Sequence, residues 1–138
     1  VSGIASGTAV TVLVQSSSTT TSLMVPLVGS GVLTARDIYP FTLGANIGTC
    51  ITAIIAALGV GGLMAEPALQ IALVHFVYNL LAVLLIFGLP WLREIPPLLS
   101  GVLADRVAKQ KVLGLVYILG VFFAMPFGFL LLSGFKLP

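Results

Sequence analysis

Within an uncharged segment that extends from Val1 to Ala35, the chain contains the stretch Gln15-Ser16-Ser17-Ser18-Thr19-Thr20-Thr21-Ser22, in which every side chain can form hydrogen bonds. In hydrocarbon, an unpaired polar group costs several kcal/mol, so such a stretch is tolerated only where it lines a cavity or is buried in protein. Hydroxyl groups, an amide and free backbone groups are also ligands for a cation or an oxyanion. This polar octet is therefore the first candidate for a binding site.

The composition of the chain indicates a membrane protein. Hydrophobic residues make up 59% of the 138 residues and charged residues 7%, whereas a soluble domain contains about 25% charged residues. We therefore expect an all-α integral membrane protein in contact with the lipid bilayer. The net charge of +2 is too small to indicate nucleic acid as a partner. Because the chain begins without Met in an apolar, helix-like pattern, we expect it to be a piece of a longer polypeptide.

Two short apolar segments flank the octet. Residues 1–14 and roughly residues 20–33 would each form a helix of about 21 Å, which is too short to cross a hydrocarbon core of about 30 Å. Two half-length helices joined by a polar tip predict a re-entrant helical hairpin over residues 1–33, which enters the membrane and returns to the same side. A single kinked span through the octet is the alternative, and we favour the hairpin.

The next uncharged segment predicts one broken transmembrane helix over residues 38–58. It follows Arg36 and Asp37, which we interpret as a solvated turn at the membrane surface. The segment is long enough to span but contains Gly44-Ala45-Asn46-Ile47-Gly48-Thr49. Each glycine costs about 1 kcal/mol relative to alanine inside a helix. We therefore expect the centre of this span to be unwound.

Two later segments, residues 67–92 and 112–135, are long enough to be full transmembrane helices. The basic segment 93–111 lies between them, and Pro96-Pro97 is expected to separate it from the preceding span. Apolar residues at near-helical spacing in its second half indicate an interfacial amphipathic helix. Since cytoplasmic loops are rich in Lys and Arg, this loop is expected in the cytoplasm. Residues 1–138 would form a single transmembrane domain.

The polar motifs have structural as well as functional interpretations. Ser and Thr stabilise contacts between membrane helices, and the G-x-x-x-G spacings of Gly3 with Gly7 and of Gly44 with Gly48 are helix-packing signals. Eight contiguous polar residues would, however, face every side of a helix, including the lipid. A polar hairpin followed by a broken helix is also how some transporters bind anions and sodium. The sequence contains no nucleophile–base pair or metal-ligand cluster, so neither an enzyme nor a cofactor is expected.

Two longer motifs resemble the type II sodium/phosphate cotransporter family: Val14-Gln15-Ser16-Ser17-Ser18-Thr19-Thr20-Thr21-Ser22 and Ile38-Tyr39-Pro40-Phe41-Thr42-Leu43-Gly44-Ala45-Asn46-Ile47-Gly48-Thr49. That family has a QSSS signature in each of two inverted repeats, each followed by a GANIGT-like segment. The similarity continues through Leu69-Gln70-Ile71-Ala72-Leu73-Val74-His75-Phe76 and the basic loop. The spans that follow these motifs make the chain look like the second repeat.

The resemblance implies sodium-driven symport of inorganic phosphate by alternating access, with Na+ as the coupling ion and no cofactor. In such a site, Ser16, Ser17 and Ser18 would bind phosphate. The sodium ligands would be Gln15, Thr19, Asn46, Thr49 and backbone carbonyls of the unwound segment around Gly44 and Gly48. The first inverted repeat would come from the same polypeptide, so this chain would supply half of the site. The protein would be multi-pass in the plasma or inner membrane.

Two other functions are compatible with the same residues. The polar hairpin could serve a channel or a carrier for another small anion. Alternatively, the chain could be a non-transporting membrane assembly module in which serines and glycines only pack helices. Measurement of sodium-dependent phosphate uptake distinguishes phosphate symport from a channel or a carrier for another anion. Alanine substitutions of Ser16–Ser18 test the assembly module, because helix packing alone should survive the exchange of one small residue for another.

Overall fold

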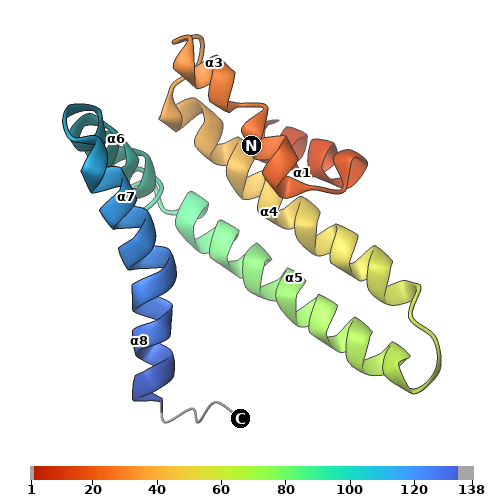
Figure 1. Ribbon diagram of the computed structural model, residues 1–138. Helices are drawn as coiled ribbons and strands as arrows, with labels where there is room; N and C mark the ends of the chain where they lie inside the picture. Colours follow the sequence, from red (N-terminus) through yellow and green to blue (C-terminus); the bar gives the residue numbers. More distant parts are fainter. Residues whose placement is uncertain (1, 134–138) are drawn as a thin grey trace. The chain divides into compact units, whose positions relative to one another are not determined.

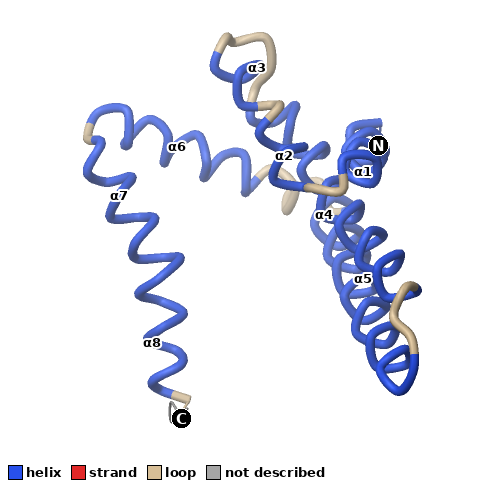
Figure 2. Tube along the Cα trace, turned by 45° about the vertical axis from the view of Figure 1, so that its right-hand side comes forward, coloured by secondary structure: helices blue, strands red, loops and turns tan. Residues whose placement is uncertain are grey.

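The computed structural model describes residues 2–133, and all regular elements among them are helical, as expected (Figures 1 and 2). In chain order they are α1 (Ser2–Val14), α2 (Ser17–Ser22), α3 (Val25–Gly29), α4 (Ala35–Leu58), the 3-10 turn η1 (Gly62–Met64), α5 (Ala65–Gly88), α6 (Ile95–Lys109), α7 (Lys111–Leu119), the π-helical η2 (Gly120–Ala124) and α8 (Met125–Leu132). The chain divides into two compact units, residues 1–97 and 98–138, which are described separately.

Three helical segments are long and apolar enough to cross a membrane: Ala35–Leu58, Gly62–Gly88 and Lys111–Leu132. They overlap the segments expected at 38–58, 67–92 and 112–135. The second helix, α5, ends at Gly88 rather than at residue 92, and a turn precedes α6. The expected start of the hairpin at Val1 and the expected end of the last span at Phe135 lie outside the described residues.

The hairpin region differs from the expected pair of half-length helices. Only Gln15 and Ser16 form the turn after α1, and the other six residues of the octet form α2 (Figure 2). The second arm consists of α2 and α3 instead of one helix over residues 20–33. Pro26 explains the break, since proline lacks an N–H and its ring clashes with the carbonyl of the residue four positions earlier, here Ser22.

α4 is continuous from Ala35 to Leu58, so the prediction of a broken helix with an unwound centre is wrong. Gly44 and Gly48 are instead points at which α4 approaches α1 closely. A Cβ atom added to Gly44 would lie 2.0 Å from the Ile4 carbonyl oxygen, and one added to Gly48 would lie 2.6 Å from the Thr11 Cβ. Close packing of two helix backbones compensates for the weak helix propensity of glycine.

α1 and α4 run side by side in the same direction. Gly3 approaches Pro40, Gly7 approaches Phe41 and Ala45, and Thr11 approaches Gly48. This register places the turn after α1 about one helical turn beyond Gly48, beside the interior of α4 rather than beside its ends. If α4 spans the membrane, the polar turn therefore lies within the membrane.

α5 packs against α4 and runs antiparallel to it (Figure 1). Leu43, Ile47 and Val83 form the buried apolar cluster between these helices, with Ile4 of α1 and Phe76 packed against it. Most other large apolar side chains of α5 are exposed, which is the pattern of a helix that faces lipid or further protein.

The segment expected as a basic loop is mostly the helix α6, which begins at the end of the first unit and continues into the second. Pro96 and Pro97 lie in its first turn, where a missing N–H breaks no helical hydrogen bond, so they begin the helix instead of interrupting it. The last span contains the π-helical turn Gly120–Ala124 directly before Pro126. Because proline disturbs the preceding helical turn, a local π-turn is a natural way to continue the helix.

The close approach of α1 and α4 predicts that Gly7→Ala and Gly44→Ala destabilise the protein. In each variant the added methyl group meets a backbone carbonyl of the facing helix, which cannot move as a side-chain end does. We expect the free energy of unfolding to fall by about 1–3 kcal/mol, the usual cost of overpacking. The measurement is thermal unfolding of the full-length protein in detergent.

The matched control is Gly88→Ala, because Gly88 is also helical but has nothing within 4 Å of its added Cβ. This variant should unfold at the midpoint of the unsubstituted protein or above it. An unchanged midpoint for Gly44→Ala would contradict the contact between α1 and α4.

Candidate functional site

The turn between α1 and α2 has a strained backbone at Gln15. Its φ of 60° lies in the left-handed region, which costs a non-glycine residue about 1–3 kcal/mol. The Gln15 N–H donates to the Thr11 carbonyl at 2.8 Å, and Nε2 donates to the Val12 carbonyl at 3.0 Å. Among residues 2–133, no donor pairs with the Gln15 amide oxygen, so this oxygen can accept a cation or a donor.

Ser16 and the threonines of the octet hold α2 in place. Ser16 caps α2, and its Oγ accepts hydrogen bonds from the N–H of Thr19 at 3.3 Å and from the Thr19 hydroxyl at 3.0 Å. The Thr20 hydroxyl donates to the Ser16 carbonyl at 2.8 Å, and the Thr21 hydroxyl donates to the Ser17 carbonyl at 2.9 Å. These threonines thus use their protons on backbone carbonyls, while the hydroxyl proton of Ser16 stays free to donate.

Ser17 and Ser18 provide hydroxyl groups that form no hydrogen bond within the described part of the chain. Ser17 is half-buried and Ser18 is exposed. Their backbone N–H groups lie in the first turn of α2, where no earlier helical carbonyl is in reach. The turn therefore presents several unpaired donors close together, and no charged side chain occurs before Arg36 in the sequence.

The second group of expected site residues lies on α4. Asn46 is exposed although its neighbours Ala45 and Ile47 are buried, and Thr49 is half-buried with its hydroxyl donating to the Ala45 carbonyl at 3.0 Å. α2 contacts α4, so the octet and this helix lie together, but no hydrogen bond among residues 2–133 joins the octet to Asn46 or Thr49.

Gly44 and Gly48 do not present freed carbonyl groups in the expected way, since α4 is not unwound. The Gly44 carbonyl accepts the Thr8 hydroxyl across the contact between α1 and α4, at 3.0 Å. We therefore assign both glycines to helix packing.

Thr11 is a residue that the sequence analysis missed. It is fully buried against Gly48, one turn before Gln15, and its Oγ1 has no hydrogen-bond partner among residues 2–133. A buried hydroxyl without a partner costs about 1–3 kcal/mol. The signal in the sequence was the four-residue spacing of Gly3, Gly7 and Thr11, which places them on one face of α1.

The interpretation of Arg36 and Asp37 as a solvated turn is only partly correct. Asp37 forms a capping box with Thr34, whose hydroxyl donates to its carboxylate at 2.6 Å, and thereby starts α4. Arg36 forms an ion pair with Glu94, far along the sequence. Among residues 2–133 there is no group of three or more His, Cys, Asp or Glu side chains that could hold a metal ion.

Known proteins resemble this chain over nearly its whole length. A family model described as Na+/Pi-cotransporter matches residues 1–133. Sodium-dependent phosphate transport protein 2B of Bos taurus is 42% identical over 120 residues, which cover 87% of this chain and 17% of that protein. The 2B protein of Mus musculus is 43% identical with the same coverage, and the 2A protein of Oryctolagus cuniculus is 43% identical over 87% of this chain and 18% of that protein.

The chain spans less than a fifth of the length of these relatives. No solved structure matches it significantly. The relatives are named as transport proteins, in agreement with the expectation that the chain is not an enzyme. Because the family match covers far more than half of the chain, the chain belongs to the Na+/Pi-cotransporter family.

Proposed function

We propose that the protein carries out sodium-coupled symport of inorganic phosphate by alternating access, and that this chain supplies one half of a central site. The observation that carries the proposal is the family match over residues 1–133, together with relatives named as sodium-dependent phosphate transport proteins. The unpaired donors and acceptors at the turn after α1 support the same function chemically. The protein is then multi-pass in the plasma or inner membrane.

Phosphate is bound by Ser16, Ser17 and Ser18. The support is that the Ser17 and Ser18 hydroxyls have no competing partner in the described residues, and that Ser16 retains its proton. Neighbouring N–H groups of the turn add further donors. Such donors match an oxyanion, which has only acceptors.

Sodium is bound by side-chain oxygens of Gln15, Thr19, Asn46 and Thr49. The amide oxygen of Gln15 is unpaired, and the Thr19 and Thr49 hydroxyls donate their protons to neighbours, which leaves lone pairs for a cation. Since the turn has no cationic side chain, sodium itself balances the charge of phosphate. The two substrates then bind cooperatively, and each raises the affinity of the other by the same factor.

The remaining ligands come from the first inverted repeat of the same polypeptide. The exposure of Gln15, Ser18, Thr19 and Asn46 in this chain supports this, since a transport site must be enclosed on all sides in at least one state. The bilayer surrounds the other exposed apolar helix faces.

The first test addresses sodium. Gln15→Ala and Asn46→Ala in the full-length protein should each raise the sodium concentration for half-maximal phosphate uptake, because each removes one amide oxygen from the cation. Through coupling of about 1–3 kcal/mol, apparent phosphate affinity should fall as well. The measurement is phosphate uptake into proteoliposomes as a function of sodium concentration.

Gln110→Ala is the matched control, because Gln110 also carries an amide but precedes α7 in the second unit, where its side chain caps nothing. Its sodium curve should coincide with that of the unsubstituted protein. Unchanged sodium curves in both test variants would remove Gln15 and Asn46 from the site.

The second test addresses phosphate. The double variant Ser17→Ala with Ser18→Ala should raise the KM for phosphate at least about tenfold, because it removes two hydroxyl donors to a charged ligand. Thermal stability should change little, since neither hydroxyl holds the fold. Ser30→Ala removes a hydroxyl that only caps its own turn and serves as the control.

Two outcomes would contradict this assignment. An unchanged KM in the double variant would leave the octet as a helix-packing element. Sodium-driven uptake of labelled sulfate, with none of labelled phosphate, would identify the protein as a carrier of another anion.

A further inference from the structure

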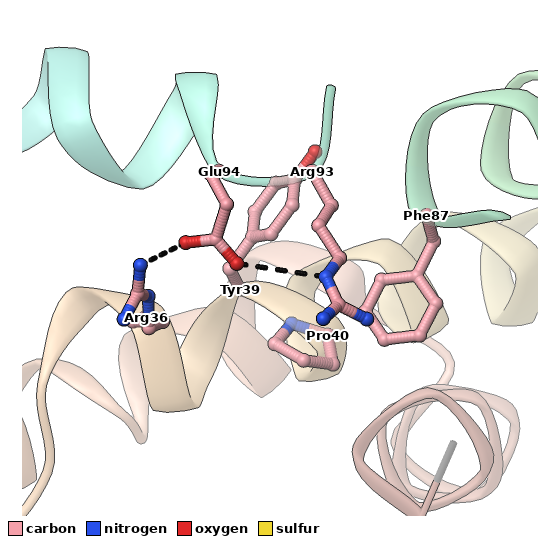
Figure 3. A pocket seen from close by; sticks show the side chains of 6 residues that line it. All are labelled: Arg36, Tyr39, Pro40, Phe87, Arg93 and Glu94. Atoms are coloured by element: carbon pink, nitrogen blue, oxygen red, sulfur yellow. Dashed lines mark hydrogen bonds and ion pairs between the residues drawn. The ribbon is translucent and has the colours of Figure 1, made fainter. Parts of the chain in front are cut away.

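A cavity of about 200 Å³ lies where α4 begins and α5 ends (Figure 3). Its lining consists of Arg36, Tyr39, Pro40, Phe87, Arg93 and Glu94. None of these residues belongs to the polar octet or to the site residues of α4. All six lie within the first unit of the chain.

The charged residues of this cavity form one cluster with Glu94 at its centre. The carboxylate pairs with the Arg36 guanidinium through one oxygen, and its other oxygen lies 3.5 Å from Nε of Arg93. The Arg93 guanidinium also lies over the Phe87 ring, 5.8 Å from its centroid. The residues that line the cavity carry two cations and one anion, a net charge of +1, and the neighbouring Asp37 carboxylate, which bonds to Thr34, is not part of the lining.

Both arginines retain the capacity to bind an anion. A guanidinium has five N–H donors, and each arginine uses one nitrogen on Glu94. No other hydrogen-bond acceptor pairs with either guanidinium among residues 2–133. The Arg36 side chain is 72% exposed and that of Arg93 44%, so a ligand can reach both.

The position and the walls of the cavity indicate the kind of anion. The cavity lies at the ends of two segments that are long and apolar enough to span a membrane, which is the depth of the lipid headgroups. Trp91, three residues after the end of α5, is exposed, as is usual for aromatic residues at membrane surfaces. Tyr39, Pro40 and Phe87 form the apolar wall of the cavity.

We infer that this cavity binds the headgroup of an anionic phospholipid. The phosphodiester carries one negative charge, which balances the cluster, and guanidinium groups bind phosphate oxygens in pairs. The apolar wall contacts the glycerol and the first acyl carbons, a contact that free inorganic phosphate cannot make. The site is independent of the proposed transport site.

The experiment uses the full-length protein in nanodiscs with spin-labelled phosphatidylglycerol as the probe and spin-labelled phosphatidylcholine as the reference. We expect phosphatidylglycerol to associate preferentially with the protein. The double variant Arg36→Gln with Arg93→Gln should reduce this preference about 25-fold, which is about fivefold for each of the two basic side chains lost at a membrane surface. An unchanged preference would overturn the site.

Glu94→Gln provides a second test, in which the association of phosphatidylglycerol should increase instead of decrease. It removes the competing carboxylate and raises the net charge of the cluster, so phosphatidylglycerol should associate more strongly. Glu66→Gln, which removes a carboxylate in the first turn of α5 at its other end, should have no effect. Weaker association in Glu94→Gln, at unchanged thermal stability, would overturn the assignment.

A competition experiment with inorganic phosphate distinguishes a site for a phospholipid headgroup from a site for the free phosphate ion. Addition of phosphate at millimolar concentration should leave the association of phosphatidylglycerol unchanged, apart from the screening that an equal ionic strength of chloride also produces. Displacement by phosphate beyond that of chloride would make this a site for the free anion, and would overturn the lipid assignment.

Discussion

The contact between the backbones of α1 and α4 determines where everything else in the first unit can lie. At Gly7 and Gly44 the facing carbonyl oxygen lies about where a side chain would begin, so the register of the two helices has almost no freedom. That register fixes how far α1 extends along α4, and therefore where the chain turns at Gln15. A helix of 13 residues is too short to cross a bilayer, so the polar turn is held within the depth of α4 by packing rather than by its own preference.

The fold could be predicted from the sequence wherever length and hydrophobicity decided the outcome. The all-helical class and the three long apolar helices followed from uncharged segments bounded by charge or proline, and the short first helix followed from the polar octet that ends it. The prediction of a broken helix is wrong because the low helix propensity of glycine describes α4 alone. In the folded protein, the effect of Gly44 and Gly48 depends on the helix that packs against them. The sequence shows the G-x-x-x-G spacing of Gly3 with Gly7, but it does not say whether this segment packs against the one at Gly44 and Gly48. Likewise, the prediction that Pro96-Pro97 separates the basic segment from the preceding span overlooks that the first turn of a helix, here α6, tolerates proline.

For the candidate site, the sequence indicated the residue types but not their hydrogen-bond partners. In the octet, the Thr20 and Thr21 hydroxyls bond to carbonyls and that of Thr19 bonds to the Ser16 hydroxyl oxygen, while those of Ser17 and Ser18 form no hydrogen bond among residues 2–133. This division depends on where α2 begins, and the left-handed turn at Gln15 determines that start. The spacing of Gly3, Gly7 and Thr11 placed Thr11 on the face of α1 that carries the glycines, but its burial depends on the facing helix. The ion pair of Arg36 with Glu94 had no signal in the sequence, because it joins segments far apart in the chain. The family resemblance is confirmed by the match over residues 1–133, whereas the role of each motif residue stays a prediction.

The two anion sites suggested here differ in one physical respect that suits their tasks. A fixed guanidinium attracts an anion in every conformation of the protein, so it holds a ligand well and releases it poorly. That property suits a lipid that stays bound at the membrane surface near Arg36 and Arg93. A carrier must release phosphate on the far side, and a site of neutral hydroxyls loses most of its attraction once sodium leaves. In the proposed symport, the mobile cation rather than a fixed charge within residues 1–35 brings the charge balance to the octet and takes it away again.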